Sequence, residues 1–172
     1  RGHSKRVREY AVRTAVLLGY TGEFLDDIRL GADLHDIGKI GTRESVLNKP
    51  GPLTPDEFRH ITEHTVLGER ILAPLARDRP VVLRIARSHH ERLDGTGFPD
   101  GLAGNAIPVE ARIVAVVDAF DAMTTNRAYR ESFEPGSAFD ELRRCAGLQF
   151  EPAIVDAFRT AFPDPARLPI HA

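Results

Sequence analysis

The chain has 172 residues, of which 42% are hydrophobic and 28% are charged, with a formal net charge of −2 and one cysteine, Cys145. A domain usually takes about 100–200 residues, so this length predicts a single domain spanning 1–172 with its own core. The composition excludes a disordered tail and a collagen, and the small net charge argues against a DNA-binding surface. The longest apolar stretch, Ile113 to Val117, is far shorter than the ~20 residues of a membrane helix. With one cysteine, a reducing cytoplasm is the expected location.

Proline and glycine separate segments of helical periodicity, which predicts an all-α, single-domain bundle of about seven helices. The expected helices, in chain order, are His3–Leu18, Glu23–Leu34, one from Pro55 through Leu72, one from Pro80 to His90, one after Pro108 through Phe120, and two shorter ones begun by Pro135 and Pro152. The run Thr54-Pro55-Asp56-Glu57 reads as a capping box and fixes the third start. Ile113–Val117 is β-branched and also fits a short strand, but the flanking residues favour helix.

Histidines carry the most chemical information, because three of them fall in two adjacent pairs of ligand residues, His35-Asp36 and His89-His90. Neighbours on a helix diverge by about 100°, so each pair can offer two ligands to metal ions about 3.5–4 Å apart. Asp36 is the natural bridging ligand, since a carboxylate has two oxygens. The other predicted ligands are His35, His64, His89 and His90, with Asp118 as a second carboxylate and His3 as a further candidate.

This nitrogen and oxygen ligand set contains no thiolate, so it suits iron or manganese and is compatible with zinc. Taken singly, a histidine is more often a surface or core residue than a ligand. His60 lies one turn before His64 and competes for the same role. The joint occurrence of the two pairs with Asp118 is what favours a metal site.

Lys39 follows His35 by one turn on the predicted helix, where its ammonium can reach a metal-bound phosphate; a solvated lysine is the alternative. Gly38 and Gly41 flank it and indicate close approach of backbone or ligand. Asp121, one turn beyond Asp118, is predicted either to orient a metal-bound imidazole or to lie on a solvated surface.

The connection between His90 and Pro108 contains four glycines and is long for a structureless loop. Because it leaves directly from His89-His90, it is predicted to form a wall of the site, with an ordinary surface loop as the alternative. Glu91 and Asp94 are candidates for supporting the ligands or for fixing this loop.

The runs His35-Asp36-Ile37-Gly38-Lys39 and His89-His90-Glu91-Arg92-Leu93-Asp94-Gly95-Thr96-Gly97-Phe98-Pro99 resemble the two signatures of the HD-GYP domain, a bacterial branch of the HD phosphohydrolases. The resemblance continues over nearly the whole chain. It implies an all-helical fold and a centre of two or three divalent ions, usually iron or manganese with zinc, nickel or cobalt as other candidates, that hydrolyses cyclic di-GMP to pGpG or GMP. The glutamate that marks trinuclear members would precede Arg1, which leaves the number of ions open.

The resemblance also implies roles for particular residues. It gives the metal ligands as His3, His35, Asp36, His64, His89, His90 and Asp118, the catalytic residues as Asp36 and Lys39, and the substrate-binding residues as Lys39, Arg127, Arg130, Gly97, Phe98 and Pro99. Phe98 stands where the family has tyrosine, so an aromatic face is kept and a hydroxyl is lost.

The expected function is therefore a metal-dependent cyclic di-GMP phosphodiesterase. The alternatives are an HD phosphohydrolase acting on another cyclic dinucleotide or nucleotide, and a weakly active module that binds cyclic di-GMP. Expected partners are the dinucleotide, a diguanylate cyclase contacting the glycine-rich loop, an upstream regulatory domain, and a second copy in a homodimer. Neither DNA binding nor a membrane segment is expected.

Overall fold

The computed structural model describes residues 2–125 and 132–163. Its helices are α1 (His3–Leu17), α2 (Glu23–Leu34), α3 (Glu44–Leu47), α4 (Pro55–Thr62), α5 (His64–Leu72), α6 (Pro80–Ser88), α7 (Val109–Thr124), α8 (Pro135–Arg144) and α9 (Pro152–Ala161), with 3-10 turns η1 (Ile37–Gly41) and η2 (Gly104–Ala106). These ranges contain isolated β-bridges but no strand. The predicted all-α fold is confirmed. Every helix in these ranges is too short or too polar to span a lipid bilayer.

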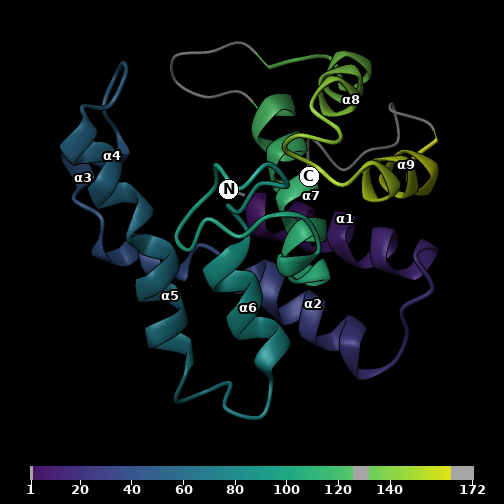
Figure 1. Ribbon diagram of the computed structural model, residues 1–172, viewed down its shortest axis with the longest axis horizontal. Coiled ribbons are helices and arrows are strands. Elements are labelled where there is room, and N and C mark those ends of the chain that lie inside the picture. The colour runs from purple at the N-terminus through teal and green to yellow at the C-terminus, as the bar shows by residue number, and fades with distance from the viewer. Residues whose placement is uncertain (1, 126–131, 164–172) are drawn as a thin grey trace.

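Helix α7 is the centre of the molecule (Figure 1). It packs against α1, α6, α8 and α9. Ile113, Val114, Val116 and Val117 are all fully buried, so their side chains contact neighbours on several sides of the helix. A helix that is apolar all round belongs in a core, and this explains why a β-branched run that also fits a strand is helical here.

The core continues from α7 into α1, α8 and α9 through an aromatic cluster. Tyr10, Phe120 and Phe158 are fully buried, and their rings lie 5.0–5.8 Å apart between centroids. Aromatic side chains bury large areas, so this cluster fixes α1 rigidly against α7. It thereby sets the position of His3 on α1 relative to Asp118 on α7.

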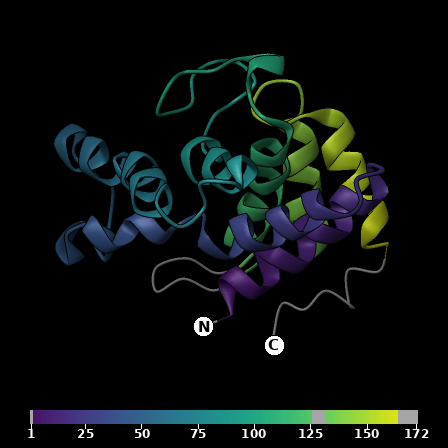
Figure 2. The same ribbon diagram turned by 90° about the horizontal axis from the view of Figure 1, so that it is seen from below.

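Helices α3 and α4 form an arm at one end of the molecule, far from α8 and α9 (Figure 2). The predicted capping box is present: the Thr54 hydroxyl accepts from the Glu57 amide, and the Glu57 carboxylate accepts from the Thr54 amide. The arm places Phe58 of α4 beside the site described below.

The structure departs from the predicted helices near the site, where one helix is divided and another ends early. The predicted helix from Pro55 through Leu72 is two helices, α4 and α5, because side chains take up carbonyls at the junction: His64 Nδ1 donates to Ile61 O, and Thr65 Oγ1 donates to Thr62 O. Helix α2 ends at Leu34 and α6 at Ser88. The prediction that His35 and Lys39 share a helix face is therefore wrong, since a 3-10 turn carries Lys39.

Candidate metal centre

The predicted ligands come from helix ends and from the middle of α7. His3 is the first residue of α1, and His64 is the first residue of α5. His35 and His89 directly follow α2 and α6, with Asp36 and His90 next in the chain. Asp118 lies on α7. A residue just beyond a helix end is free of the helical repeat, so adjacent side chains such as His89 and His90 can both face one point.

The structure brings all seven predicted ligands together in two adjacent groups. In the first, ligand atoms of Asp36, His64, His89 and His90 all lie within 4.8 Å of one another. In the second, the same holds for His3, His35 and Asp118. Each group has the nitrogen and carboxylate composition that divalent transition metals take.

Asp36 faces both groups, one oxygen to each. Its Oδ1 lies 3.4 Å from His64 Nε2 and 3.7 Å from His89 Nε2. Its Oδ2 lies 3.5 Å from His35 Nε2. His35 Nε2 is in turn 3.8 Å from Asp118 Oδ1, which lies 3.4 Å from His3 Nε2. This is the arrangement of a carboxylate that bridges two ions.

Backbone carbonyls fix the tautomer of three imidazoles. Nδ1 of His35 lies 2.8 Å from Ala32 O, Nδ1 of His64 lies 2.6 Å from Ile61 O, and Nδ1 of His89 lies 3.0 Å from Ile85 O. A carbonyl only accepts, so Nδ1 carries the proton and the Nε2 lone pair points into the site.

Those lone pairs are buried and have no hydrogen-bond partner. Nε2 of His35, His64 and His89, together with Asp36 Oδ1, are buried side-chain atoms without a partner in the part of the chain that is described. Burying such groups unpaired is costly, and four of them converge on one point. Divalent cations satisfy all four, so the residues present fit the metals that the resemblance implies.

Burial favours the neutral form of His35, His64 and His90. It lowers the pKa of His35 and lowers the pKa of His64 to about 4. Burial, together with neighbouring His89, also holds the pKa of His90 well below its usual value. The pKa of Asp36 lies below its usual range although burial raises it, because the ammonium of Lys39 beside it favours the ionised carboxylate. At neutral pH His35, His64 and His90 are thus neutral beside the ionised carboxylate of Asp36, the protonation states that bind metal.

A second layer of residues holds His3. Nδ1 of His3 lies 2.8 Å from Asp121 Oδ2, and this hydrogen bond raises the pKa of His3. Arg6 donates to both carboxylate oxygens of Asp121, from Nε to Oδ1 at 2.5 Å and from Nη2 to Oδ2 at 2.9 Å. Its Nη2 also donates to Thr125 Oγ1. Asp121 is 1% exposed, so it orients an imidazole and is not solvated surface. Sequence reasoning missed Arg6; its spacing of one helical turn from His3 was the available signal.

Lys39 lies at the edge of the site. Its Nζ is 2.6 Å from Asp36 Oδ2, and the side chain is about one-third exposed. The glycine before it is required by packing: a Cβ on Gly38 would collide with the carbonyl oxygen of His64 and lie 2.6 Å from the amide nitrogen of Gly68. The predicted close approach at Gly38 is therefore confirmed, and the partner is the backbone of α5.

A cavity of about 470 Å³ opens over the two groups. Its lining includes His3, Asp36, Lys39, Phe58, His89, His90, Arg92, Thr96, Gly97, Phe98, Asp118 and Gln149. The glycine-rich loop supplies one wall, as predicted. The Phe98 ring lies over His90, 4.8 Å between centroids, and a Cβ on Gly97 would lie 2.6 Å from His90 O.

Glu91 fixes this loop. Its buried carboxylate accepts from the amides of Asp100 and Leu102, at 2.7 and 3.0 Å. Arg87 binds Asp100 through two nitrogens and Glu69 of α5 through a third. Of the two roles predicted for Glu91, the structure shows the one that holds the loop.

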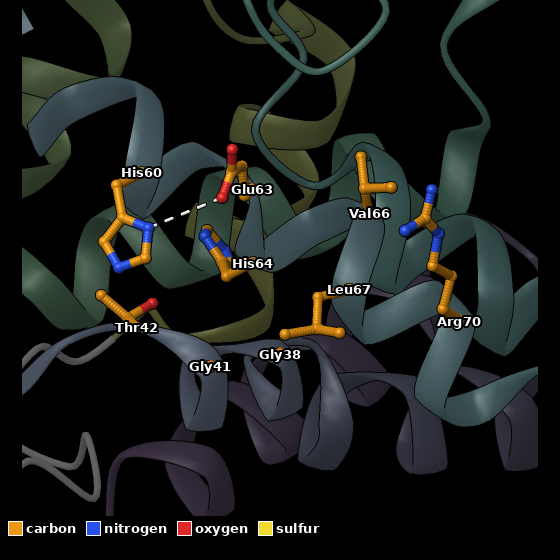
Figure 3. A pocket seen from close by; sticks show the side chains of 9 residues that line it. All are labelled: Gly38, Gly41, Thr42, His60, Glu63, His64, Val66, Leu67 and Arg70. Carbon is orange, nitrogen blue, oxygen red and sulfur yellow. Dashed lines mark ion pairs between the residues drawn. The ribbon is translucent and has the colours of Figure 1, made fainter. Parts of the chain in front are cut away.

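A second cavity, of about 420 Å³, lies behind His64 and η1, and Figure 3 shows His60 and Glu63 at one end of it and Arg70 at the other. His60 Nε2 accepts from the Arg43 amide, and its Nδ1 pairs with Glu63. His60 is absent from both ligand groups, so it does not replace His64.

Arg127 and Arg130, predicted to bind substrate, lie outside the described residues.

A protein-family model described as an HD domain matches residues 1–154. The chain belongs to the HD domain family. A cyclic di-GMP phosphodiesterase of Thermotoga maritima is 42% identical over 160 residues, which cover 91% of this chain and 43% of that protein. A 3'3'-cGAMP-specific phosphodiesterase 2 of Vibrio cholerae is 35% identical over 173 residues, covering 94% and 33%. The HD domain described here thus spans less than half the length of these relatives.

The fold of this HD domain is also found in solved structures. Bd1817, described as an HDG"Y"P protein from Bdellovibrio bacteriovorus, superimposes with a TM-score of 0.76 at 21% identity, over 94% of this chain and 52% of that one. The resemblance to HD-GYP proteins noted from the two signatures therefore extends to the arrangement of the helices.

Proposed function

We propose that this HD domain is a metal-dependent phosphodiesterase that hydrolyses cyclic di-GMP to pGpG or GMP. The observation that carries the proposal is Asp36, whose two oxygens face imidazole nitrogens of two groups at 3.4–3.7 Å. Paired metal sites of this kind suit in-line displacement at phosphorus, where both the attacking and the leaving oxygen need stabilisation. The name of the Thermotoga maritima relative supports the same reaction.

The metal ligands in this proposal are His3, His35, Asp36, His64, His89, His90 and Asp118. When bound, divalent ions supply positive charge at the scissile phosphate and lower the pKa of water at the site. Four positive charges against the carboxylates of Asp36 and Asp118 leave about two, which explains how a chain of net charge −2 attracts a dianion. Iron or manganese, with two or three ions, is our proposal for their identity and number.

Lys39 is the residue we assign to charge stabilisation during the reaction. Its ammonium sits 2.6 Å from Asp36 Oδ2, at the mouth of the cavity. From there it can donate to a phosphate oxygen that gains negative charge as the P–O bond breaks. Asp36 would hold the metals, and its contact with Lys39 would place the ammonium beside the substrate phosphate. Gly97, Phe98 and Pro99 shape the wall that receives the substrate, and Arg127 and Arg130 remain proposed phosphate or base contacts.

The cavity agrees with a dinucleotide in both size and lining. About 470 Å³ lies within the range of ligand sites in general. Two aromatic rings, Phe58 and Phe98, stand at its edge with centroids 6.1 Å apart. Bases stack on such rings, and Phe98 keeps the aromatic face that tyrosine offers in the family.

A second candidate substrate is another cyclic dinucleotide, since the Vibrio cholerae relative is named as cGAMP-specific. The deciding experiment is turnover of cyclic di-GMP, 3'3'-cGAMP and cyclic di-AMP by the manganese- or iron-loaded protein, followed by chromatography of the products. Preference for cyclic di-GMP, with release of pGpG or GMP, is expected. Equal or greater turnover of another dinucleotide would reassign the substrate, and binding without turnover would indicate a signalling module.

The protein's wider context is also proposed from sequence. We propose a cytoplasmic location, an upstream regulatory domain, a homodimer, and contact between the glycine-rich loop and a diguanylate cyclase. The loop is suited to contact because Glu91 and Arg87 hold it rigidly while its tip is exposed.

A further inference from the structure

Arg92 lines the cavity and is held in one orientation by its own loop. Its Nε lies 2.9 Å from Thr96 Oγ1 and 3.3 Å from Asp94 Oδ1, and its Nη2 lies 3.1 Å from Asp94 Oδ2. Asp94 is itself fixed by the amide and hydroxyl of Thr96. One edge of the guanidinium, Nε and Nη2, is therefore occupied. Within the described ranges no partner is present for Nη1, so the Nη1–Nη2 edge remains available as a pair of parallel donors.

The charge of Arg92 is already compensated. Asp94 pairs with it directly, and the hydrogen bond from Arg92 lowers the pKa of Asp94, so the carboxylate is ionised at neutral pH. A phosphate is attracted most strongly by an uncompensated positive charge. A compensated guanidinium with a fixed free edge is better suited to a neutral partner that offers two parallel acceptors.

The surroundings of Arg92 have the shape for a flat, polar partner. Ala115, Ala119 and Ala122 lie on one face of α7 and line the same cavity with small side chains. Gln149 is joined to the loop by the hydrogen bond from Leu93 N to its carbonyl, and its side-chain amide lines the cavity without a partner among the described residues. The amide offers both a donor and an acceptor.

We infer that Arg92 recognises a guanine base of the substrate, through donation from its Nη1–Nη2 edge to O6 and N7, and that Gln149 contacts the same base. Arginine paired with guanine O6 and N7 is the commonest specific contact to that base. Adenine presents an N6 amino donor where guanine has O6, so two donors would face each other. Arg92 is thus the residue that makes the site prefer guanine, an inference that rests on the proposed function.

The test replaces Arg92 and compares guanine with adenine ligands. Arg92→Lys keeps the charge but loses the planar fork, and Arg92→Gln offers an amide that matches adenine N6 and N7. For Arg92→Lys we expect kcat/KM for cyclic di-GMP to fall by about tenfold or more, with less than about threefold change for cyclic di-AMP. For Arg92→Gln the guanine-to-adenine ratio should fall by at least about tenfold. The calorimetric preference for guanine, measured as the Kd of AMP divided by the Kd of GMP, should fall in both variants as well.

The outcomes separate this inference from the proposed function. Arg144→Lys, an exposed arginine paired with Glu141 on α8, is the matched control and should leave both substrates unchanged. A wild-type protein that hydrolyses cyclic di-GMP while Arg92→Lys loses both substrates equally would overturn base recognition and assign Arg92 to loop structure. An unchanged Arg92→Lys would overturn it as well. A metal-loaded wild-type protein that turns over neither substrate would refute the proposed function and this inference together.

Discussion

Asp36 is the residue on which the metal centre depends. Its two oxygens face different imidazole groups, so its removal leaves each group short of an anionic ligand. We expect Asp36→Ala to lower turnover by more than about a hundredfold and to reduce bound metal, with helical content retained. Metal analysis and circular dichroism check this. Asp33→Asn, one turn earlier on α2 and paired with Arg8 at the surface, is the control. Activity within a factor of ten of wild type would refute the bridging role.

Lys39 lies beside Asp36, and the proposed function assigns it stabilisation of the charge that develops on the phosphate. Loss of one donor aimed at developing charge typically costs about 10²–10³ in kcat, and we expect a fall of that order for Lys39→Ala. Metal content should stay constant, because Lys39 is not a ligand. Lys49→Ala, a lysine paired with Glu57 on the arm, should have no effect on kcat. If both lysine variants retain wild-type rates, Lys39 is an ordinary surface residue.

At the residue scale the sequence was highly informative about the site. All seven predicted ligands lie in the two groups, and they could be chosen from the sequence because imidazoles and carboxylates are the residue types that suit divalent metals. The supporting residues were harder to predict. Arg6 was missed because it acts on His3 through Asp121, which is 115 residues away, and the two roles open to Glu91 could be separated only by its hydrogen bonds to loop amides.

At the scale of elements, the junction between η1 and α5 holds Asp36 against His64. The two backbones touch at Gly38, where any Cβ would meet the His64 carbonyl. We therefore expect Gly38→Ala to push α5 away, to lower the melting temperature by several degrees and to weaken metal binding. Gly136→Ala on α8, where a Cβ meets no atom within 4 Å, is the control. Equal melting temperatures for both variants would contradict this packing.

Helix boundaries were the least predictable part of the fold. Periodicity located all the long helices, and Glu23–Leu34 agrees with α2 at both ends. It failed at the site itself, where the predicted helices through Lys39, His64 and His90 are interrupted or end early. At these boundaries the imidazoles also bond the backbone: Nδ1 of His64 and of His89 donate to Ile61 O and Ile85 O in the preceding turn, contacts that apolar periodicity does not report.

At the scale of the whole molecule, the buried imidazoles make the metal-free protein sensitive to acid. Burial lowers the pKa of His64 to about 4, whereas in the unfolded chain it is near 6.5. Between these values the unfolded state binds the proton and the folded state does not, so stability falls as pH decreases from about 6.5 to about 4. His35 and His90 act in the same direction, and His3, whose pKa is raised, opposes them. Thermal melts of chelator-treated protein between pH 7.5 and 4.5 should show falling stability. A flat or rising profile would contradict this balance.

The central claim is that residues from four helix ends and from α7 assemble one centre with Asp36 between two ions. Anomalous diffraction from crystals of the metal-loaded protein, collected at the metal absorption edges, tests it most directly. We predict at least two peaks on either side of Asp36, one near His64, His89 and His90, the other near His3, His35 and Asp118. A single peak, or peaks away from Asp36, would contradict the account.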